Sequence, residues 1–243
     1  MPPIRGILFD KDGTLLDYDA TWNPAYAEAA VEVAGGDAEL SERLLVATGW
    51  DLASARAVPG TLLAAGTNDE IGDAWGALLP AARRRADMGG WLDGIFMRVT
   101  ARTAVSLVDL PRLFAGLQTR RIAVGVATND SEPGARASLA PFGILDTLDF
   151  LAGFDSGHGG KPGPGMALAF CDKIGCQPLE ITVVGDNIHD FEMGRAAGAG
   201  LAIGVLSGNA AAGELDPHAD HVIGSVADLT GLLDQLPGAV TET

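Results

Sequence analysis

The chain is poor in positive charge. Its 243 residues include 16 Lys and Arg against 32 Asp and Glu, a formal net charge of −16 at pH 7. A surface with this excess of negative charge repels nucleic acid and anionic lipid, so we expect neither as a partner. An anionic small molecule would need local cations to hold it. The sequence has only three lysines, Lys11, Lys161 and Lys173, so their places in the fold are informative.

Cysteines and long apolar runs are also scarce. The two cysteines, Cys171 and Cys176, lie five residues apart within one predicted helix. This spacing places them on different faces and argues against a disulfide. No window reaches the roughly 18 apolar residues that a membrane span needs, and the apolar stretch near the N-terminus is too short for a signal peptide. We therefore expect a cytoplasmic protein.

Short apolar runs recur along the chain, each followed by Gly, Asp or Asn and then by a helical pattern. Continuous runs of this kind are typical of strands buried on both faces of a mostly parallel sheet. The runs predict strands over residues 4–9, 121–128, 148–154, 180–185, 201–205 and 221–224. Their alternation with helical segments predicts a doubly wound α/β fold.

One region interrupts the alternation of strands and helices. Residues 18–104 contain only helical patterns, including a capping box formed by Thr67 and Glu70 and an N-cap at Asp37. Apolar stripes at helical spacing indicate packing within this region. We expect a small all-α cap domain at 18–104, inserted after the first strand of a core formed by 1–17 and 105–243.

Four groups of polar residues follow the predicted strands, where ligands bind in open parallel sheets. Each group has an ordinary structural alternative: a turn, a helix cap or a solvated loop lysine. Their order along the chain, each after a strand, favours a shared site, and crowded carboxylates near a buried strand call for a compensating cation. The groups are Asp10 with Asp12, Thr128 with Asn129 and Asp130, Lys161, and Asp186 with Asp190.

These motifs resemble the haloacid dehalogenase superfamily of aspartate-nucleophile phosphohydrolases. The stretch "DKDGT" at 10–14 matches that family's first motif, Thr128 its strand-end Thr or Ser, Lys161 its loop lysine, and "GDNIHD" at 185–190 its last acidic motif. The resemblance covers the whole chain. The overall pattern is similar to that of the phosphoglycolate phosphatase and β-phosphoglucomutase branch. It implies a Rossmann-like catalytic core and an α-helical cap.

The resemblance implies a Mg²⁺-dependent phosphatase that acts on a small phosphorylated metabolite, with phosphoglycolate as a nominal substrate. Asp10 would attack the phosphoryl group and form an aspartyl phosphate, and Asp12 would act as general acid and base. The phosphoryl oxygens would be bound by Thr128, by the backbone around Asn129 and by Lys161. The metal would be held by the carboxylates of Asp10 and Asp186, by the backbone carbonyl of Asp12, and by Asp190 directly or through water.

Two other functions remain open: a sugar-phosphate mutase with the same site, and a binding protein that keeps the fold without turnover. An acid at Asp12 argues against cleavage of carbon–halogen bonds. The absence of lysine between Tyr18 and Arg102 excludes the family's phosphonate-cleaving chemistry, which uses a cap lysine. The sequence leaves open the substrate and whether the protein is a monomer or a homodimer.

Several other residues suit more than one role. Because neighbouring side chains alternate in an extended segment, Lys11 is predicted to point away from the phosphate, where it could balance nearby acids. Tyr18 and Trp22 follow the first motif and are candidates for contacts to the leaving group, with packing an equal alternative for Trp22. Arg83–Arg85 are expected to be solvated, with substrate binding as the minority interpretation.

Overall fold

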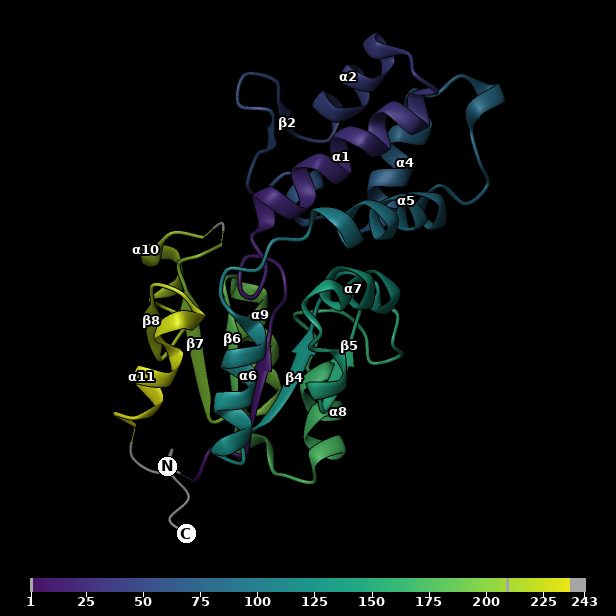
Figure 1. Cartoon of the computed structure of the whole chain (residues 1–243). Coiled ribbons are helices and arrows are strands. Elements are labelled where there is room, and N and C mark those ends of the chain that lie inside the picture. The colour runs from purple at the N-terminus through teal and green to yellow at the C-terminus, as the bar shows by residue number, and fades with distance from the viewer. Residues whose placement is uncertain (1, 209, 237–243) are drawn as a thin grey trace. The chain divides into compact units, whose positions relative to one another are not determined.

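The computed structural model describes residues 2–208 and 210–236 (Figure 1). The chain divides into two compact units, one formed by 1–17 with 105–243 and the other by 18–104. Each unit has its own hydrophobic core. Within the described residues, no helix combines the length and the apolarity that crossing a bilayer requires.

The larger unit contains a six-stranded, fully parallel sheet in the order β5-β4-β1-β6-β7-β8. The strands are β1 (Gly6–Phe9), β4 (Ala123–Ala127), β5 (Phe150–Ala152), β6 (Ile181–Gly185), β7 (Leu201–Val205) and β8 (His221–Ile223). All six lie within the predicted apolar runs. Strand β1 pairs with β4 on one side and with β6 on the other, so the strand order reverses direction at β1. Such a switch point opens a ligand-binding crevice at the carboxyl ends of the strands.

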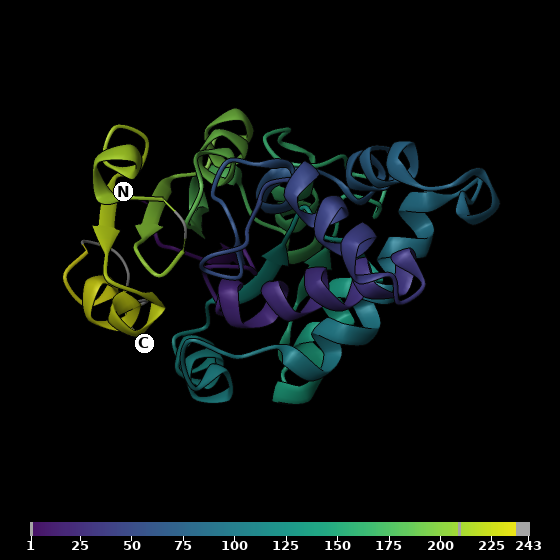
Figure 2. The same cartoon turned by 90° about the horizontal axis from the view of Figure 1, so that it is seen from above.

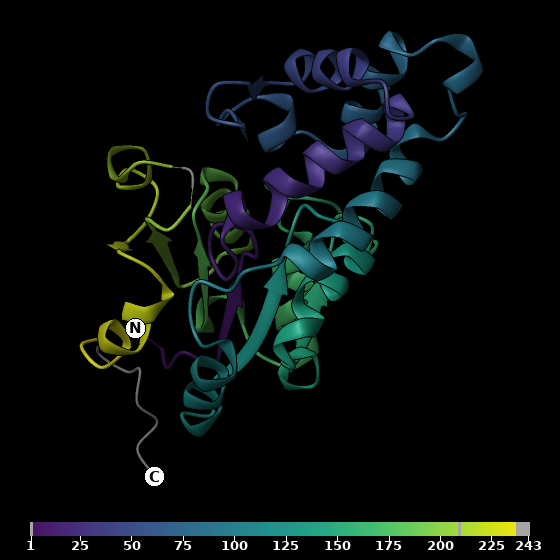
Figure 3. The ribbon, with the colours of Figure 1, turned by 45° about the horizontal axis from the view of Figure 1, so that its top comes forward.

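Helices cover both faces of this sheet (Figures 2 and 3). Leu8 belongs to an apolar cluster with Phe170 of α8, whereas the ring of its neighbour Phe9 lies 5.9 Å from that of Phe114 of α6. The alternation of side chains along β1 thus places one helix layer on each face. The helices are α6 (Leu110–Thr119), α7 (Glu132–Leu139), α8 (Gly165–Ile174), α9 (Ile188–Ala197), α10 (Ala212–Leu215) and α11 (Leu229–Leu233). The predicted doubly wound fold is confirmed.

Short 3₁₀ turns lie between several of these elements. In the larger unit they are Ala140–Phe142, Leu145–Thr147, Pro178–Glu180 and Val226–Asp228, and the smaller unit has one at Ala81–Arg83. Asp109 caps α6 and Ser131 caps α7, each with a side chain that accepts a backbone N–H group.

The smaller unit is mainly helical. Its helices are α1 (Tyr18–Ala34), α2 (Ala38–Ala47), α3 (Leu62–Ala65), α4 (Asn68–Leu78) and α5 (Met88–Thr103). Aromatic rings of α1 and α5 form the centre of its core, where Tyr26 meets Phe96 edge-on at 5.5 Å. The capping box of Thr67 and Glu70 begins α4, and Asp37 caps α2, as predicted.

This unit also contains a small hairpin, which differs from the all-α expectation. Strands β2 (Trp50–Asp51) and β3 (Arg56–Ala57) pair antiparallel. The Asp51 carboxylate accepts hydrogen bonds from the backbone N–H groups of Ala53 and Ser54, which tightens the turn. Two residues per strand are too few to produce an apolar alternation, so no pattern in the sequence predicts this hairpin.

The two cysteines do not belong to one helix, although the sequence predicts that they do. Helix α8 ends at Ile174, and Gly175 adopts a left-handed conformation with φ of 64°. Cys176 therefore lies beyond the helix, and its N–H donates to the Cys171 carbonyl oxygen at an N···O distance of 3.1 Å, so the expectation of one helix for both cysteines is wrong. Both cysteines are free thiols in the structure, and burial raises the pKa of Cys171 to about 12.

Candidate active site

Three of the predicted site residues follow neighbouring strands of the parallel sheet. Asp10 comes directly after β1, Thr128 after β4 and Asp186 after β6. Because β1 lies between β4 and β6, the carboxyl ends of these strands meet at one edge. The order of the strands, which no local pattern contains, therefore brings together residues that are far apart in the sequence.

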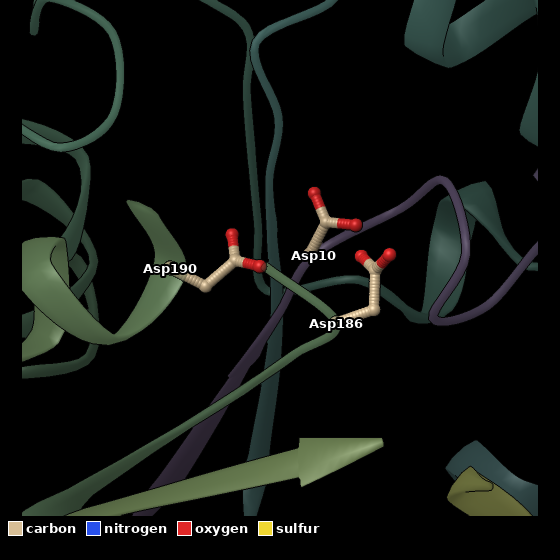
Figure 4. Close-up of side chains that lie close together, drawn as sticks. All are labelled: Asp10, Asp186 and Asp190. Atoms are coloured by element: carbon tan, nitrogen blue, oxygen red, sulfur yellow. The ribbon is translucent and has the colours of Figure 1, made fainter. Parts of the chain in front are cut away.

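Three carboxylates converge at this edge. Oxygen atoms of Asp10, Asp186 and Asp190 lie within 4.8 Å of one another (Figure 4). All three side chains are largely buried, and Asp190 is only 1% exposed. Burial raises the pKa of the Asp10 carboxyl to about 7, against the opposing effect of the Lys161 ammonium. A buried set of oxygen donors of this kind can hold a hard divalent cation.

Lys161 supplies the local positive charge. Its Nζ lies 2.5 Å from Oδ1 of Asp10 and 2.6 Å from Oδ1 of Asp190. Burial alone would lower the pKa of Lys161, but these two carboxylates outweigh that effect and raise the pKa above its ordinary value. The lysine is thus a permanent cation against the acidic cluster.

The side chain of Asn129 holds the lysine loop. Its Oδ1 accepts the backbone N–H of Lys161 at 2.8 Å, and its Nδ2 donates to the Lys161 carbonyl oxygen at 3.1 Å. This pair of hydrogen bonds joins the segment after β4 to the segment after β5. The Asn129 side chain is therefore engaged with the backbone of the protein, which leaves backbone groups as its predicted contribution to phosphate binding.

Asp190 is fixed from both sides. Its Oδ1 accepts from Lys161, and its Oδ2 accepts the backbone N–H of Asn187 at 3.0 Å, within the capping box that begins α9. A Cβ atom at Gly185 would lie 2.2 Å from Asp190 Oδ2. Glycine at the end of β6 therefore permits the close approach of this carboxylate.

Thr128 is buried where β4 ends. Its N–H donates to the Ala152 carbonyl oxygen at 3.0 Å, and its Oγ1 accepts the N–H of Asp130 at 3.1 Å. The sheet therefore fixes this residue beside the β1 end that carries Asp10. The turn that follows is held by the hydroxyl group.

Lys11 lies in a buried ion-pair network rather than at the surface. Its side chain is fully buried, with Nζ 2.7 Å from Asp12 Oδ2 and 3.0 Å from Asp130 Oδ2. It therefore balances nearby acids, which the sequence left as an option. The interpretation of Asp130 as a helix cap is wrong, because Ser131 caps α7 and its Oγ accepts the N–H of Gly134.

The segment after β7 also reaches the site, and the sequence predicts no role for it. Ser207 Oγ donates to the Gly13 carbonyl oxygen at 2.8 Å, next to Asp12. A Cβ atom at Gly208 would lie 1.8 Å from Asp186 Oδ2. A Ser-Gly pair after a strand is typical of any turn, so only the fold identifies these contacts.

The cap-region candidates are occupied within the smaller unit. Trp22 stacks on Tyr26 at 5.5 Å, which supports the packing alternative, and the Tyr18 hydroxyl lies 2.9 Å from that of Tyr26. Arg85 covers the ring of Trp91 at 3.7 Å, while Arg84 donates to the Leu79 carbonyl oxygen. The contacts of these side chains thus lie within the smaller unit, and Arg83–Arg85 are exposed, as expected.

Comparison with known proteins identifies the family. Residues 4–198 match the model of the haloacid dehalogenase-like hydrolases. The phosphoglycolate phosphatase of Yersinia pseudotuberculosis serotype I (strain IP32953) is 28% identical over 231 residues, which cover 93% of this chain and 91% of that protein. The phosphoglycolate phosphatase of Escherichia coli (strain K12) is 26% identical over 224 residues, covering 85% and 84% of the two chains. These relatives agree with the prediction from the sequence that the chain is a phosphoric monoester hydrolase.

Solved structures agree on the fold. A protein from Thermotoga maritima assigned as a β-phosphoglucomutase superposes with a TM-score of 0.68 over 96% of this chain and 100% of its own, at 19% identity. CbbY from Rhodobacter sphaeroides, solved in complex with phosphate, gives a TM-score of 0.61 at 21% identity, covering 93% of this chain and 96% of that one. At such identities the match concerns the fold alone. The matched residues, the fold and the motifs agree that this chain belongs to the haloacid dehalogenase-like hydrolase family.

Proposed function

We propose that this protein is a Mg²⁺-dependent phosphatase that acts on a small phosphorylated metabolite of the phosphoglycolate type. The observation that carries the proposal is the convergence of a buried carboxylate cluster and a buried lysine on Asp10. A phosphoryl group needs both a nucleophile and a cationic environment, and this arrangement supplies both. The phosphoglycolate phosphatases among its relatives support the same substrate class.

The oxygen donors fit magnesium, which favours a few carboxylates and retained water molecules. Asp10 and Asp186 would hold the ion by their carboxylates and Asp12 by its backbone carbonyl. Since both oxygens of Asp190 already accept hydrogen bonds, we expect Asp190 to act through water. When bound, the ion would neutralise part of the negative charge that gathers around the transferring group.

The reaction would proceed in two displacements. A carboxylate oxygen of Asp10 attacks phosphorus while the bond to the leaving oxygen breaks, and Asp12 in its acid form gives that oxygen a proton. Asp12, now a carboxylate, takes a proton from a water molecule that attacks the aspartyl phosphate. The bond from phosphorus to Asp10 then breaks, which releases inorganic phosphate and restores both residues.

Binding of the transferring group falls to the residues around Asp10. Lys161 places an ammonium group directly beside this nucleophile, and Thr128 with the backbone around Asn129 would bind the remaining oxygens. Fixed donors of this kind act most strongly where negative charge spreads in the transition state. They need no reorganisation because the sheet and the Asn129 hydrogen bonds hold them in place.

A phosphate-release screen across phosphorylated metabolites, with p-nitrophenyl phosphate as a general substrate, tests the proposal. We expect release that requires Mg²⁺ and is lost on chelation of the metal. The Asp10→Asn variant should lose activity by at least about 10⁴-fold, because it lacks the nucleophile. Hydrolysis without metal, or an active Asp10→Asn variant, would contradict the mechanism.

A sugar-phosphate mutase is the second candidate, favoured by the structural match to the T. maritima protein. It would use the same site but return the phosphoryl group to a second hydroxyl of the sugar. Such an enzyme interconverts phosphosugars without net phosphate release. Formation of an isomeric phosphosugar would therefore indicate a mutase, and release of inorganic phosphate a phosphatase. A binding protein on the same fold would show neither reaction and still bind a phosphorylated ligand.

We also propose the division of labour expected from the sequence. Residues 1–17 and 105–243 would form the catalytic core, and residues 18–104 the cap that selects the leaving group. The reaction would take place in the cytoplasm, on a small soluble substrate. Exchange of residues 18–104 for those of a relative should change substrate preference while keeping hydrolysis of p-nitrophenyl phosphate.

A further inference from the structure

Lys11 and Asp130 have no part in the steps proposed above, yet both are buried against Asp12. The ammonium group of Lys11 contacts Asp12 Oδ2 at 2.7 Å and Asp130 Oδ2 at 3.0 Å. The Lys11 side chain has no exposed surface, and that of Asp130 is 4% exposed. A buried lysine carries a large desolvation cost that close carboxylates offset. A buried lysine at this position is therefore costly in free energy, and apolar side chains could stabilise the fold equally well.

The far end of this network is firmly anchored. Asp130 Oδ1 accepts the backbone N–H of Ser131 at 2.8 Å, and the Asp130 N–H donates to Thr128 Oγ1 at 3.1 Å. Asp130 is thus tied into the turn between β4 and α7. Through Lys11, this turn restrains the Asp12 carboxyl group, which belongs to the segment after β1.

The near end of the network leaves one Asp12 oxygen available. Oδ2 is held by Lys11, whereas Oδ1 is buried and has no hydrogen-bond partner among the described residues. A buried oxygen without a partner is costly, so Oδ1 is the oxygen left to meet a group of the substrate. The contact to Lys11 therefore fixes which oxygen of Asp12 can exchange protons with a reacting group.

We propose that Lys11, anchored by Asp130, is a positioning residue that holds the Asp12 carboxyl in the orientation needed for proton transfer to the leaving oxygen. This role rests on the proposed phosphatase function and deepens it. The ion pairs orient one carboxyl oxygen for the reaction. Neither Lys11 nor Asp130 needs to touch the substrate.

The test uses a change that keeps the buried charges balanced. Lys11→Met alone would leave two carboxylates facing each other, so the main variant is Lys11→Met with Asp130→Asn, checked for folding by circular dichroism. The matched control is Lys173→Met, the same replacement on an exposed part of α8. Each protein is assayed with p-nitrophenyl phosphate and with the best alkyl phosphate from the metabolite screen.

The two substrates separate a positioning role from a structural one. An alkyl leaving group depends on the acid far more than p-nitrophenolate does, and kcat/KM reports the steps up to its departure. We expect the double variant to lose about 10²-fold in kcat/KM on the alkyl phosphate but less than about fivefold on p-nitrophenyl phosphate. Equal losses on both substrates, or no loss on either, would overturn the proposal.

A second comparison asks whether the effect passes through Asp12. In an Asp12→Asn background, the changes at Lys11 and Asp130 should leave the ratio of the two kcat/KM values unchanged within about twofold, since effects through one group are not additive. A further drop in that ratio would show that Lys11 acts elsewhere. Wild-type protein that hydrolyses neither ester would contradict the proposed function and, with it, this role of Lys11.

Discussion

Asp10 lies in an environment that favours its neutral form. Its side chain is about 10% exposed and has a second carboxylate, that of Asp190, close by. Such a site is unfavourable for folding, because the negative charge of Asp10 is poorly solvated there. If Asp10 is the nucleophile, as proposed, this residue links catalysis to a measurable cost in stability.

This link predicts a pH-dependent stability difference between the metal-free wild type and Asp10→Asn. The pKa of Asp10 is raised from 3.8 to about 7 in the folded protein, so the folded state binds more protons than the unfolded state between these values. The contribution of Asp10 to the free energy of unfolding therefore falls as pH rises through this window. The Asn variant lacks this loss and should gain about 1–3 kcal/mol over wild type between pH 5 and pH 8.

Urea unfolding with a chelator present, at several pH values, measures this difference. Asp172→Asn makes the same replacement on the exposed surface of α8 and should show no comparable widening. A constant difference between wild type and Asp10→Asn across the range would show that Asp10 is ionised at little cost.

At the scale of elements, the site depends on links between segments that follow different strands. The segment after β4 and the segment after β5 are joined by Asn129, and the turn after β1 meets the turn after β7 through Ser207. Strand ends bring these segments near one another, but hydrogen bonds between side chain and backbone set their final positions. Local changes at these links should therefore affect catalysis more than they affect the fold.

Replacement of Asn129 by Ala tests this expectation. The variant loses two hydrogen bonds to the backbone of Lys161, each contributing about 1 kcal/mol, so the lysine is held less firmly against Asp10. We expect kcat/KM on p-nitrophenyl phosphate to fall by about 10- to 100-fold, with a loss of about 2 kcal/mol in the free energy of unfolding. Steady-state kinetics and urea unfolding measure the two effects.

Gln118→Ala is the matched control for this variant. The Gln118 amide also donates to a backbone carbonyl oxygen, that of Thr147 at 3.2 Å, but it is exposed and belongs to α6. Its removal should leave the kinetics unchanged. If Asn129→Ala behaved like Gln118→Ala, the link to Lys161 would have no role in catalysis.

For the molecule as a whole, the acidic cluster would couple the binding of a metal ion to stability. The chain carries a formal net charge of −16, and the buried carboxylates of Asp10, Asp186 and Asp190 concentrate part of that charge in the core. A ligand that binds the folded state alone raises its stability according to its concentration and affinity. Mg²⁺ should therefore raise the melting temperature in a saturable way.

The contact between Gly208 and Asp186 allows this coupling to be tested at one residue. In Gly208→Ala the new Cβ would meet Asp186 Oδ2, so the carboxylate must move, and we expect Mg²⁺ affinity to fall by about 10- to 100-fold. Gly213→Ala is the control, because nothing lies within 4 Å of a Cβ there. Thermal unfolding across a Mg²⁺ series measures both midpoints. Equal Mg²⁺ midpoints for the two variants would show that Gly208 has no influence on metal binding.

Much of the fold could be predicted because its causes are local. Each strand of the parallel sheet is an apolar run, and most helix starts carry a side chain that satisfies exposed N–H groups, as Ser131 does for α7. The short hairpin from Trp50 to Ala57 escaped prediction because a turn, rather than an apolar pattern, holds it. The prediction that Cys176 lies within the helix was wrong for a similar reason, since the left-handed Gly175 ends the helix before it.

The sequence by itself determined the strand runs, the helix caps and the order of the motifs, because these follow from the chemistry of neighbouring residues. It also placed Asp10, Thr128 and Asp186 at strand ends. Only the tertiary structure decided which distant side chains meet there: Lys161 on Asp10, Gly208 against Asp186, and Lys11 between Asp12 and Asp130. The pairing of buried charges depends on the distances between them and on their desolvation, and both are set only when the sheet has formed.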